Sequence, residues 1–212
     1  MLILNKNILT IGGNRLEGGP LTPPEPPGPG PDPYNPLGLP SNTIRVKFKS
    51  GYTPTMGDTQ TLVDSTNNVW DIYKQSNDWN KLFYNNSNLL EVLGANTSNV
   101  TLMWDMFYYC TSLTSVQLFD TSNVTDMYWM FINCRNLTSI PLFNTSKVTD
   151  MTSTFQLCLN VESGALALYQ QASSQANPPT NHDKAFTGCG AYTTTGAAEL
   201  AQIPSSWGGN GA

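Results

Sequence analysis

The stretch TSNVTDMYWMFINCRNLTSIPLF, residues 121–143, decides the fold because it recurs along the chain. The same pattern precedes it as TSNVTLMWDMFYYCTSLTSVQLF at residues 97–119 and follows it as TSKVTDMTSTFQLCLNVES at residues 145–163. The copies start 24 residues apart and keep their columns of Met, Phe and Cys in register. A period of roughly 20–29 residues is typical of leucine-rich repeats, in which short units stack on one another.

The sequence inside one repeat predicts a short helix followed by a short strand. The spacing i, i+3, i+4, i+7 of one helix face is shown by Met127, Met130, Phe131 and Cys134. A strand is expected next, with the apolar residues Leu137, Ile140 and Leu142. A degenerate earlier repeat falls in the same columns with Trp79, Phe83, Asn86, Leu89 and Val92. We therefore predict an α/β fold, a leucine-rich-repeat solenoid with a short helix plus a short strand in each repeat.

The regions outside the repeats organise the rest of the chain. An apolar peptide at residues 1–18 precedes a proline-rich spacer at 19–41, which is expected to be extended because prolines exclude helix and central strand. Alternation of apolar and polar residues predicts a β-rich N-terminal cap at 42–72. The repeats occupy 73–168, and residues 169–212 are expected to supply a C-terminal helix, a last half-repeat and a closing cap.

The composition limits the classes of function. The formal net charge is −5, which argues against nucleic-acid binding because nucleic-acid-binding proteins need a basic surface. No apolar run has the length of a membrane span, so none is expected. The first residues alternate apolar and polar side chains, and we expect no secretory signal there.

The four cysteines are expected to be buried thiols. Cys110, Cys134 and Cys158 recur at the repeat spacing, beside columns of Phe and Leu. Disulfides between repeats are the alternative, whereas zinc is disfavoured because no CxxC pair occurs and His182 is the one histidine. No catalytic motif accompanies His182 or the acidic residues, so we predict no cofactor, no metal and no enzymatic activity.

At these residues the chain resembles the BspA-like leucine-rich-repeat family of bacterial surface proteins. The motifs Thr-Ser-Asn-Val-Thr-Asp-Met, Met-Phe-x-x-Cys and Leu-Thr-Ser-Ile of residues 121–143 carry the resemblance, which covers about 73–190. It implies a right-handed α/β solenoid with roles in adhesion and protein binding, and no catalytic residues to carry over. The module is also similar to those in virion proteins of crAss-like gut phages, which implies a phage setting.

We therefore expect a non-enzymatic virion structural or binding protein, namely a phage head fibre or a capsid decoration protein on the capsid surface. The alternatives are a bacterial cell-surface adhesin and a protein-interaction module or effector. The expected partners are capsid or other virion proteins and a host-surface glycan or protein, and we expect a homo-oligomer. The candidate anchor to the virion is the apolar N-terminal set Leu2, Leu4, Ile8, Leu9 and Ile11.

Positions that vary between repeats are free to carry specificity, because the constant positions serve the stack. Several variable positions on the outer side of the predicted helices are aromatic, and exposed aromatic residues are frequent at protein and sugar interfaces. The candidate binding face consists of Tyr84, Trp104, Tyr108, Tyr109, Tyr128 and Trp129. The alternative is that these rings pack under the caps or on their own repeats.

Overall fold

The structure is a computed structural model, and it describes residues 8–11, 14–17 and 32–212. The chain divides into two units at Gly30 and Pro31, and each unit is described by itself.

The first unit contains an antiparallel hairpin. Strand β1 (Ile8–Ile11) pairs with β2 (Asn14–Glu17). The predicted anchor residues Leu2 and Leu4 lie outside the described residues, as does the proline-rich segment as far as residue 31.

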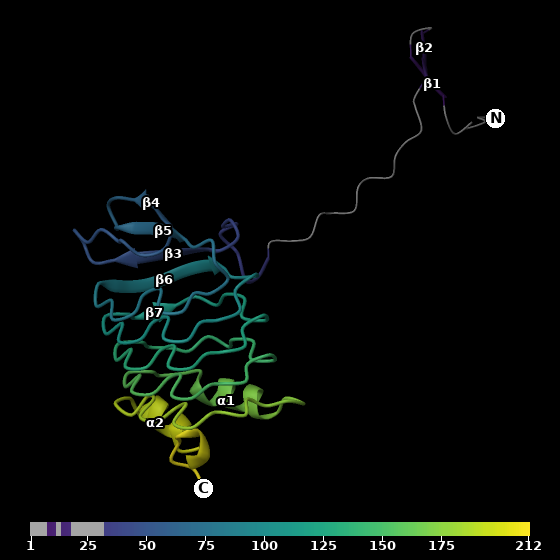
Figure 1. The fold of residues 1–212 in the computed structure, drawn as a ribbon. Helices are drawn as coiled ribbons and strands as arrows, with labels where there is room; N and C mark the ends of the chain where they lie inside the picture. Colours follow the sequence, from purple (N-terminus) through teal and green to yellow (C-terminus); the bar gives the residue numbers. More distant parts are fainter. Residues whose placement is uncertain (1–7, 12–13, 18–31) are drawn as a thin grey trace, which may run out of the picture. The chain divides into compact units, whose positions relative to one another are not determined.

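The second unit begins with a mixed sheet of five strands in the order β4-β5-β3-β6-β7 (Figure 1). β3 pairs antiparallel with both β5 and β6, whereas β6 and β7 run parallel. The strands are β3 (Thr43–Phe48), β4 (Thr59–Asp64), β5 (Val69–Tyr73), β6 (Leu89–Asn96) and β7 (Ser115–Val116). The alternation that predicts strands before residue 73 is therefore realised in β3, β4 and β5.

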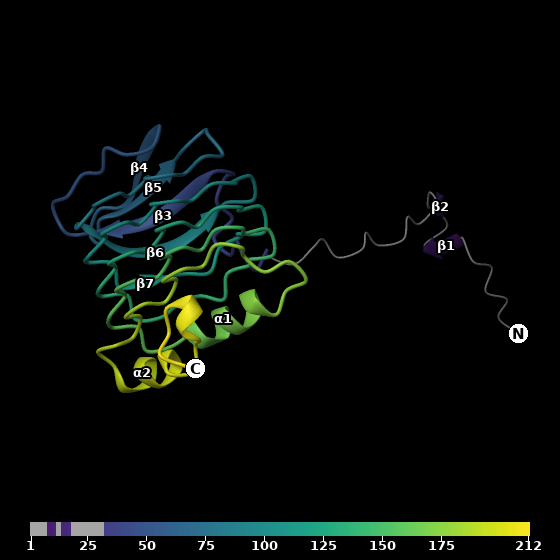
Figure 2. The same cartoon turned by 60° about the horizontal axis from the view of Figure 1, so that its bottom comes forward.

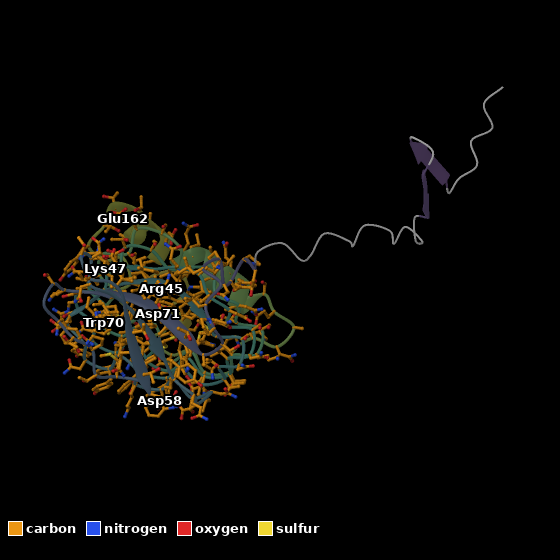
Figure 3. All side chains as sticks on the ribbon, turned by 90° about the horizontal axis from the view of Figure 1, so that it is seen from above. Arg45, Lys47, Asp58, Trp70, Asp71 and Glu162 are labelled. Atoms are coloured by element: carbon orange, nitrogen blue, oxygen red, sulfur yellow. The ribbon has the colours of Figure 1, made fainter. Side chains whose placement is uncertain are left out.

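The sheet is held on its polar side by ion pairs between neighbouring strands. β3 alternates buried apolar residues with Arg45 and Lys47, which are half-buried. Arg45 Nε lies 2.7 Å from Asp71 Oδ1 on β5, and Lys47 Nζ lies 2.8 Å from Glu91 Oε1 on β6. Figure 3 shows Arg45, Lys47 and Asp71 close together when the sheet is seen from above. Opposite charges on facing positions favour this register of β3 between its two neighbours.

The repeats after β6 are built from turns whose backbone bonds alternate in direction. In the central repeat, the amides of Cys134 and Met130 donate to carbonyls three residues back, at 3.1 and 3.2 Å. The amides of the odd-numbered residues donate to the next repeat, as Trp129 does to Thr152 O at 3.0 Å and Phe131 to Thr154 O at 2.8 Å. In each repeat, one set of amides therefore donates within the same repeat, and the other set donates to the neighbouring repeat.

Residues with a left-handed backbone produce this alternation. Two positions in each repeat have a positive φ, and in the central repeat these are Trp129 (φ 57°) and Asn133 (φ 62°). The same two positions are occupied elsewhere by Lys81, Asp105 and Ser153, and by Asn85, Tyr109 and Leu157. Left-handed residues interrupt a right-handed helix, and the amides of Trp129 and Asn133 themselves donate to the neighbouring repeat.

The predicted fold class, a right-handed leucine-rich-repeat solenoid with a helix and a strand in each repeat, is wrong. The described part of the second unit is a mixed five-stranded sheet with two short α-helices, and both helices follow the repeats. The helix expected over residues 127–134 is replaced by consecutive turns. A helix needs every amide to bond four residues back, and the positive φ of Trp129 and Asn133 prevents this.

The core consists of columns of identical side chains. The rings of Phe107, Phe131 and Phe155 are stacked, with centroids 4.9 and 5.2 Å apart. The column is extended by Phe83 before them and by Phe186 after them. All five side chains are buried, and stacked aromatic pairs add about 0.5–1.5 kcal/mol beyond the burial of apolar area.

The C-terminal segment covers the last repeat. Helix α1 (Ala165–Ser173) buries Leu168, and α2 (Thr194–Leu200) begins at Thr193, whose hydroxyl accepts from the Gly196 amide. The 3-10 helix η1 (Ser205–Trp207) follows, and the Trp207 indole stacks on His182 at 4.1 Å. Figure 2 shows α1 and α2 at the end of the unit opposite β4. Trp207 is 6% exposed and lies against Phe186, the last ring of the Phe column.

Candidate functional site

The six residues of the candidate binding face lie on the side of the second unit that is formed by the stacked turns of the repeats. We call this side the wall of turns. The turns place equivalent residues of neighbouring repeats beside one another, because the Lys81 amide donates to Trp104 O and the Asp105 amide to Tyr128 O. These bonds are 3.2 and 2.9 Å long. Side chains that are 20–25 residues apart in sequence therefore become neighbours. We refer to this set, Tyr84, Trp104, Tyr108, Tyr109, Tyr128 and Trp129, as the aromatic face.

Five rings of the aromatic face, all except that of Trp104, form a continuous cluster. Tyr84 stacks on Tyr108 with centroids 4.6 Å apart, and Tyr108 contacts Tyr109 at 4.5 Å and Trp129 at 5.8 Å. Trp129 stacks in turn on Tyr128 at 4.7 Å. Tyr84 is 46% exposed and Tyr109 is 37% exposed, while the other four are half-buried. Tyr84 and Tyr109 therefore reach solvent, whereas the contacts of Tyr108 with Tyr109 and of Tyr128 with Trp129 lie within single repeats, as part of the alternative interpretation expects.

A lysine and a buried aspartate adjoin the aromatic face. Lys81 Nζ lies 4.6 Å from the centroid of the Trp104 ring and 5.6 Å from that of Tyr84. The same nitrogen lies 4.0 Å from Asp105 Oδ2. Ammonium groups over aromatic rings are stabilised by the negative ring face, and more strongly where water is excluded.

The sequence does not single out Asp105 and Lys81 as site residues, although a signal for them exists. Asp105 stands at an outward, variable position of the predicted helix, yet the turns leave it only 6% exposed. Asp105 follows Lys81 by 24 residues, so the two opposite charges occupy the same column of neighbouring repeats. From these opposite charges in one column, the contact between Lys81 and Asp105 could have been predicted.

Burial raises the pKa of Asp105 and outweighs the Lys81 charge, which lowers it, while the Asp126 charge raises it by the smallest effect of the three. Burial likewise raises the pKa of Asp126, whose Oδ1 accepts a hydrogen bond from the Tyr128 amide at 2.8 Å. This side of the wall is therefore rich in carboxylates that are poorly compensated by positive charge.

Shallow cavities adjoin both ends of this wall. The first, of about 250 Å³, is lined by Tyr84, Lys81 and Tyr52 and by the polar run Asn85–Asn88. The second, of about 270 Å³, is lined by Thr152, Thr180, Asn181, His182, Asp183 and Ser206. Tyr84 belongs both to the first cavity and to the aromatic face, whereas the second cavity contains no residue of that face.

His182 stacks on Trp207, and its Nδ1 lies 3.1 Å from the carbonyl oxygen of Ser206. Over residues 8–11, 14–17 and 32–212, no group of three His, Cys, Asp or Glu side chains is placed to hold a metal ion. No helix within the same ranges is long and apolar enough to cross a membrane.

The cysteines form an inert column. All four are free and buried, and the thiols of Cys110, Cys134 and Cys158 each donate to a phenylalanine carbonyl of the preceding repeat at 3.1 Å. Burial raises the pKa of Cys110 and of Cys158 to about 12. A thiolate is therefore not available near neutral pH, and the expectation of buried thiols is confirmed for these residues.

Of the predicted anchor residues that the structure describes, Ile8, Leu9 and Ile11 belong to β1. Their strand is paired with β2 in the register Ile8 with Glu17 and Ile11 with Asn14. The aromatic face belongs to the second unit, and the described anchor residues belong to the first.

Comparison with known proteins identifies one family. The sequence model described as "Mycoplasma protein of unknown function, DUF285" matches residues 55–172, which include the whole aromatic face. Neither the curated proteins nor the solved structures contain a match.

Proposed function

The chain belongs to the family described as "Mycoplasma protein of unknown function, DUF285", and we propose that it is a non-enzymatic binding module whose ligand contacts the aromatic face. One observation carries the proposal: five aromatic side chains from three consecutive repeats join into one surface cluster that reaches solvent, and the sixth, Trp104, adjoins it through Lys81. Tyr and Trp bury large area at a low cost in side-chain entropy, which is why they dominate binding surfaces.

The repeat does not need these aromatic residues in order to fold. The next repeat has Thr152, Ser153 and Gln156 at the positions that correspond to Tyr128, Trp129 and Ile132, and its turns are formed by the same backbone bonds. The buried Phe and Cys columns, in contrast, continue through all repeats. Aromatic side chains at positions where the fold accepts polar ones support a role in binding.

The setting that we propose is display on a surface. A hairpin at the N-terminal end and a proline-rich segment before Thr43 suit a phage head fibre or capsid decoration protein. The bacterial cell surface is the second candidate, and the family description, which names Mycoplasma, favours it. Labelling purified phage particles and intact bacterial cells with an antibody against residues 42–212 separates the two, because each setting predicts signal on one of them.

Binding through the aromatic face is tested with the full chain carrying Trp104→Ala and Trp129→Ala. We expect binding to the labelled surface, phage particle or cell, to weaken at least about tenfold, since aromatic anchors carry most of the energy of an interface. The matched control carries Thr152→Ala and Gln156→Ala, one repeat further on, and should bind as the wild type does. Unchanged binding of the tryptophan variant, with an unchanged melting temperature, would refute the proposal.

A further inference from the structure

Asp105 is a buried carboxylate that is only partly satisfied. Its side chain is 9% exposed, and Oδ1 is buried without a hydrogen-bond partner among the residues that the structure describes. Oδ2 lies 4.0 Å from Lys81 Nζ, which is longer than a hydrogen bond. A buried carboxylate without donors is unfavourable, so Asp105 retains capacity for a further cationic donor.

The surroundings of Asp105 already hold a positive charge. The Lys81 ammonium stands over Trp104 and Tyr84 and beside Asp105, and the lysine side chain is 52% exposed. Two aromatic rings and one carboxylate thus surround a cation that is free to move into solvent. We call these three residues, Tyr84, Trp104 and Asp105, the cation seat.

The charge balance favours a second cation at this wall. Lys81 is the one basic residue between positions 75 and 134, whereas Asp78, Asp105 and Asp126 stand in the repeats of that range. The Asp126 charge further raises the pKa of Asp105, so the two carboxylates repel each other. A ligand with positive charge relieves this repulsion, and a neutral ligand does not.

We propose that the aromatic face binds a protein partner through an arginine side chain, whose guanidinium displaces Lys81 from the cation seat. The inference rests on the proposed function and names the partner chemistry for the same face. Arginine fits better than lysine for two reasons. Its planar group stacks on an indole such as that of Trp104, and its five donors reach both oxygens of a carboxylate such as Asp105.

The test uses the full chain and two short peptides of equal shape. One is acetyl-Gly-Gly-Arg-Gly-Gly-amide, and in the other citrulline replaces arginine, which removes the charge. Titration is followed by the indole NMR signals of Trp104 and Trp129. The arginine peptide should shift the Trp104 signal along a saturable curve, and the citrulline peptide should not. Equal shifts with both peptides would overturn the proposal.

Three variants define the seat. Asp105→Asn should weaken binding of the arginine peptide at least about tenfold, because a charge-assisted bond is lost. Glu162→Gln removes the same charge from an exposed position and should leave the affinity unchanged. Lys81→Met removes the resident ammonium and should tighten binding several-fold. Equal affinities of Asp105→Asn and Glu162→Gln, or no gain with Lys81→Met, would contradict the displacement.

The outcomes also separate this inference from the proposed function. If Trp104→Ala and Trp129→Ala abolish attachment to particles or cells while Asp105→Asn retains it, the aromatic face is the binding site and the cation seat is refuted. Saturable binding of a neutral oligosaccharide at Trp104, without a response to the arginine peptide, would refute the cation seat as well. If the tryptophan variant still attaches, the proposed function itself fails.

Discussion

Residues that are close together on the wall of turns differ strongly in their exposure to solvent. Tyr84 is 46% exposed, while Asp105 in the next repeat is 6% exposed and carries a charge that the surrounding rings do not solvate. The Lys81 ammonium is the one opposing charge that the structure places near it, at 4.0 Å. The buried carboxylate of Asp105 is therefore the group whose charge most destabilises this wall. Its ionisation should change the free energy of unfolding.

Asp105→Asn is expected to change how stability depends on pH. Burial raises the pKa of Asp105 above the ordinary aspartate value of 3.8, so the folded chain holds this proton more tightly than the unfolded chain. The stability that the carboxyl contributes is complete below that value and is lost as the pH rises through the folded pKa. The free energy of unfolding of Asp105→Asn, relative to wild type, should therefore increase with pH in urea titrations between about pH 3 and 7.

The opposite sign is expected for Asp64→Asn. Hydrogen bonds from the Asn67 side chain and amide lower the pKa of Asp64, so its stabilisation is present above the ordinary value and is lost as the pH falls. This variant should lose stability relative to wild type as the pH rises over the same range. Parallel curves for the two variants would contradict both assignments.

At the scale of elements, the repeat shows that the same spacing of apolar residues is compatible with a helix and with consecutive turns. Met127, Met130, Phe131 and Cys134 all face the core, as the helical pattern requires. Two consecutive turns of about four residues each produce the same inward positions as two turns of a helix. The side-chain pattern therefore identifies the buried face without identifying the backbone conformation.

The sequence predicts much of the fold and part of the site for this reason. The cap strands, the presence of a helix after the repeats and the buried columns follow from local pattern, because few neighbours are needed to decide them. The turns do not, since tryptophan, serine and leucine at positive φ carry no local signal, unlike glycine. The aromatic face is found from its columns, but the burial of Asp105 depends on contacts between repeats.

Ser153→Gly distinguishes turns from a helix by the sign of its effect. Ser153 has a φ of 53°, a conformation that costs an L-residue roughly 1–2 kcal/mol and glycine almost nothing. The free energy of unfolding should rise by about 0.5–1 kcal/mol after the entropy of the unfolded chain is included. In a helix the same change would be destabilising. Thr152→Gly, at a neighbouring position without a positive φ, should lower stability, and chemical denaturation measures both.

At the scale of the whole second unit, the two ends of the repeats are covered by different elements. The sheet of β3, β4 and β5 covers the first repeat, and α1, α2 and η1 cover the last (Figures 1 and 2). Trp207 ends the aromatic column, with its ring 6.4 Å from Phe186. The buried columns are thus closed at both ends, and solvent reaches them only if the unit opens.

The cysteine column reports such opening. Cys110, Cys134, Cys158 and Cys189 stand in four successive repeats and are buried. We expect none of them to react with a chromogenic disulfide reagent near pH 8 in the folded protein, and all of them to react after unfolding. An added Ser146→Cys, at an exposed position, should react at once and serves as the internal control. Reaction of any native cysteine at the rate of the control would contradict a closed core.

The constant spacing of the repeats sets the order in which the chain can assemble. Thr138 bonds Thr114, and Thr149 bonds Thr125, each across 24 residues, so every added repeat closes a loop of the same length. Lys47 on β3 meets Glu91 on β6 across 44 residues. A loop of nearly twice the length costs about 0.6 kcal/mol more in closure entropy. The transition state for folding should therefore lie among the repeats, and β3 should dock late, onto an edge that the repeats have already formed.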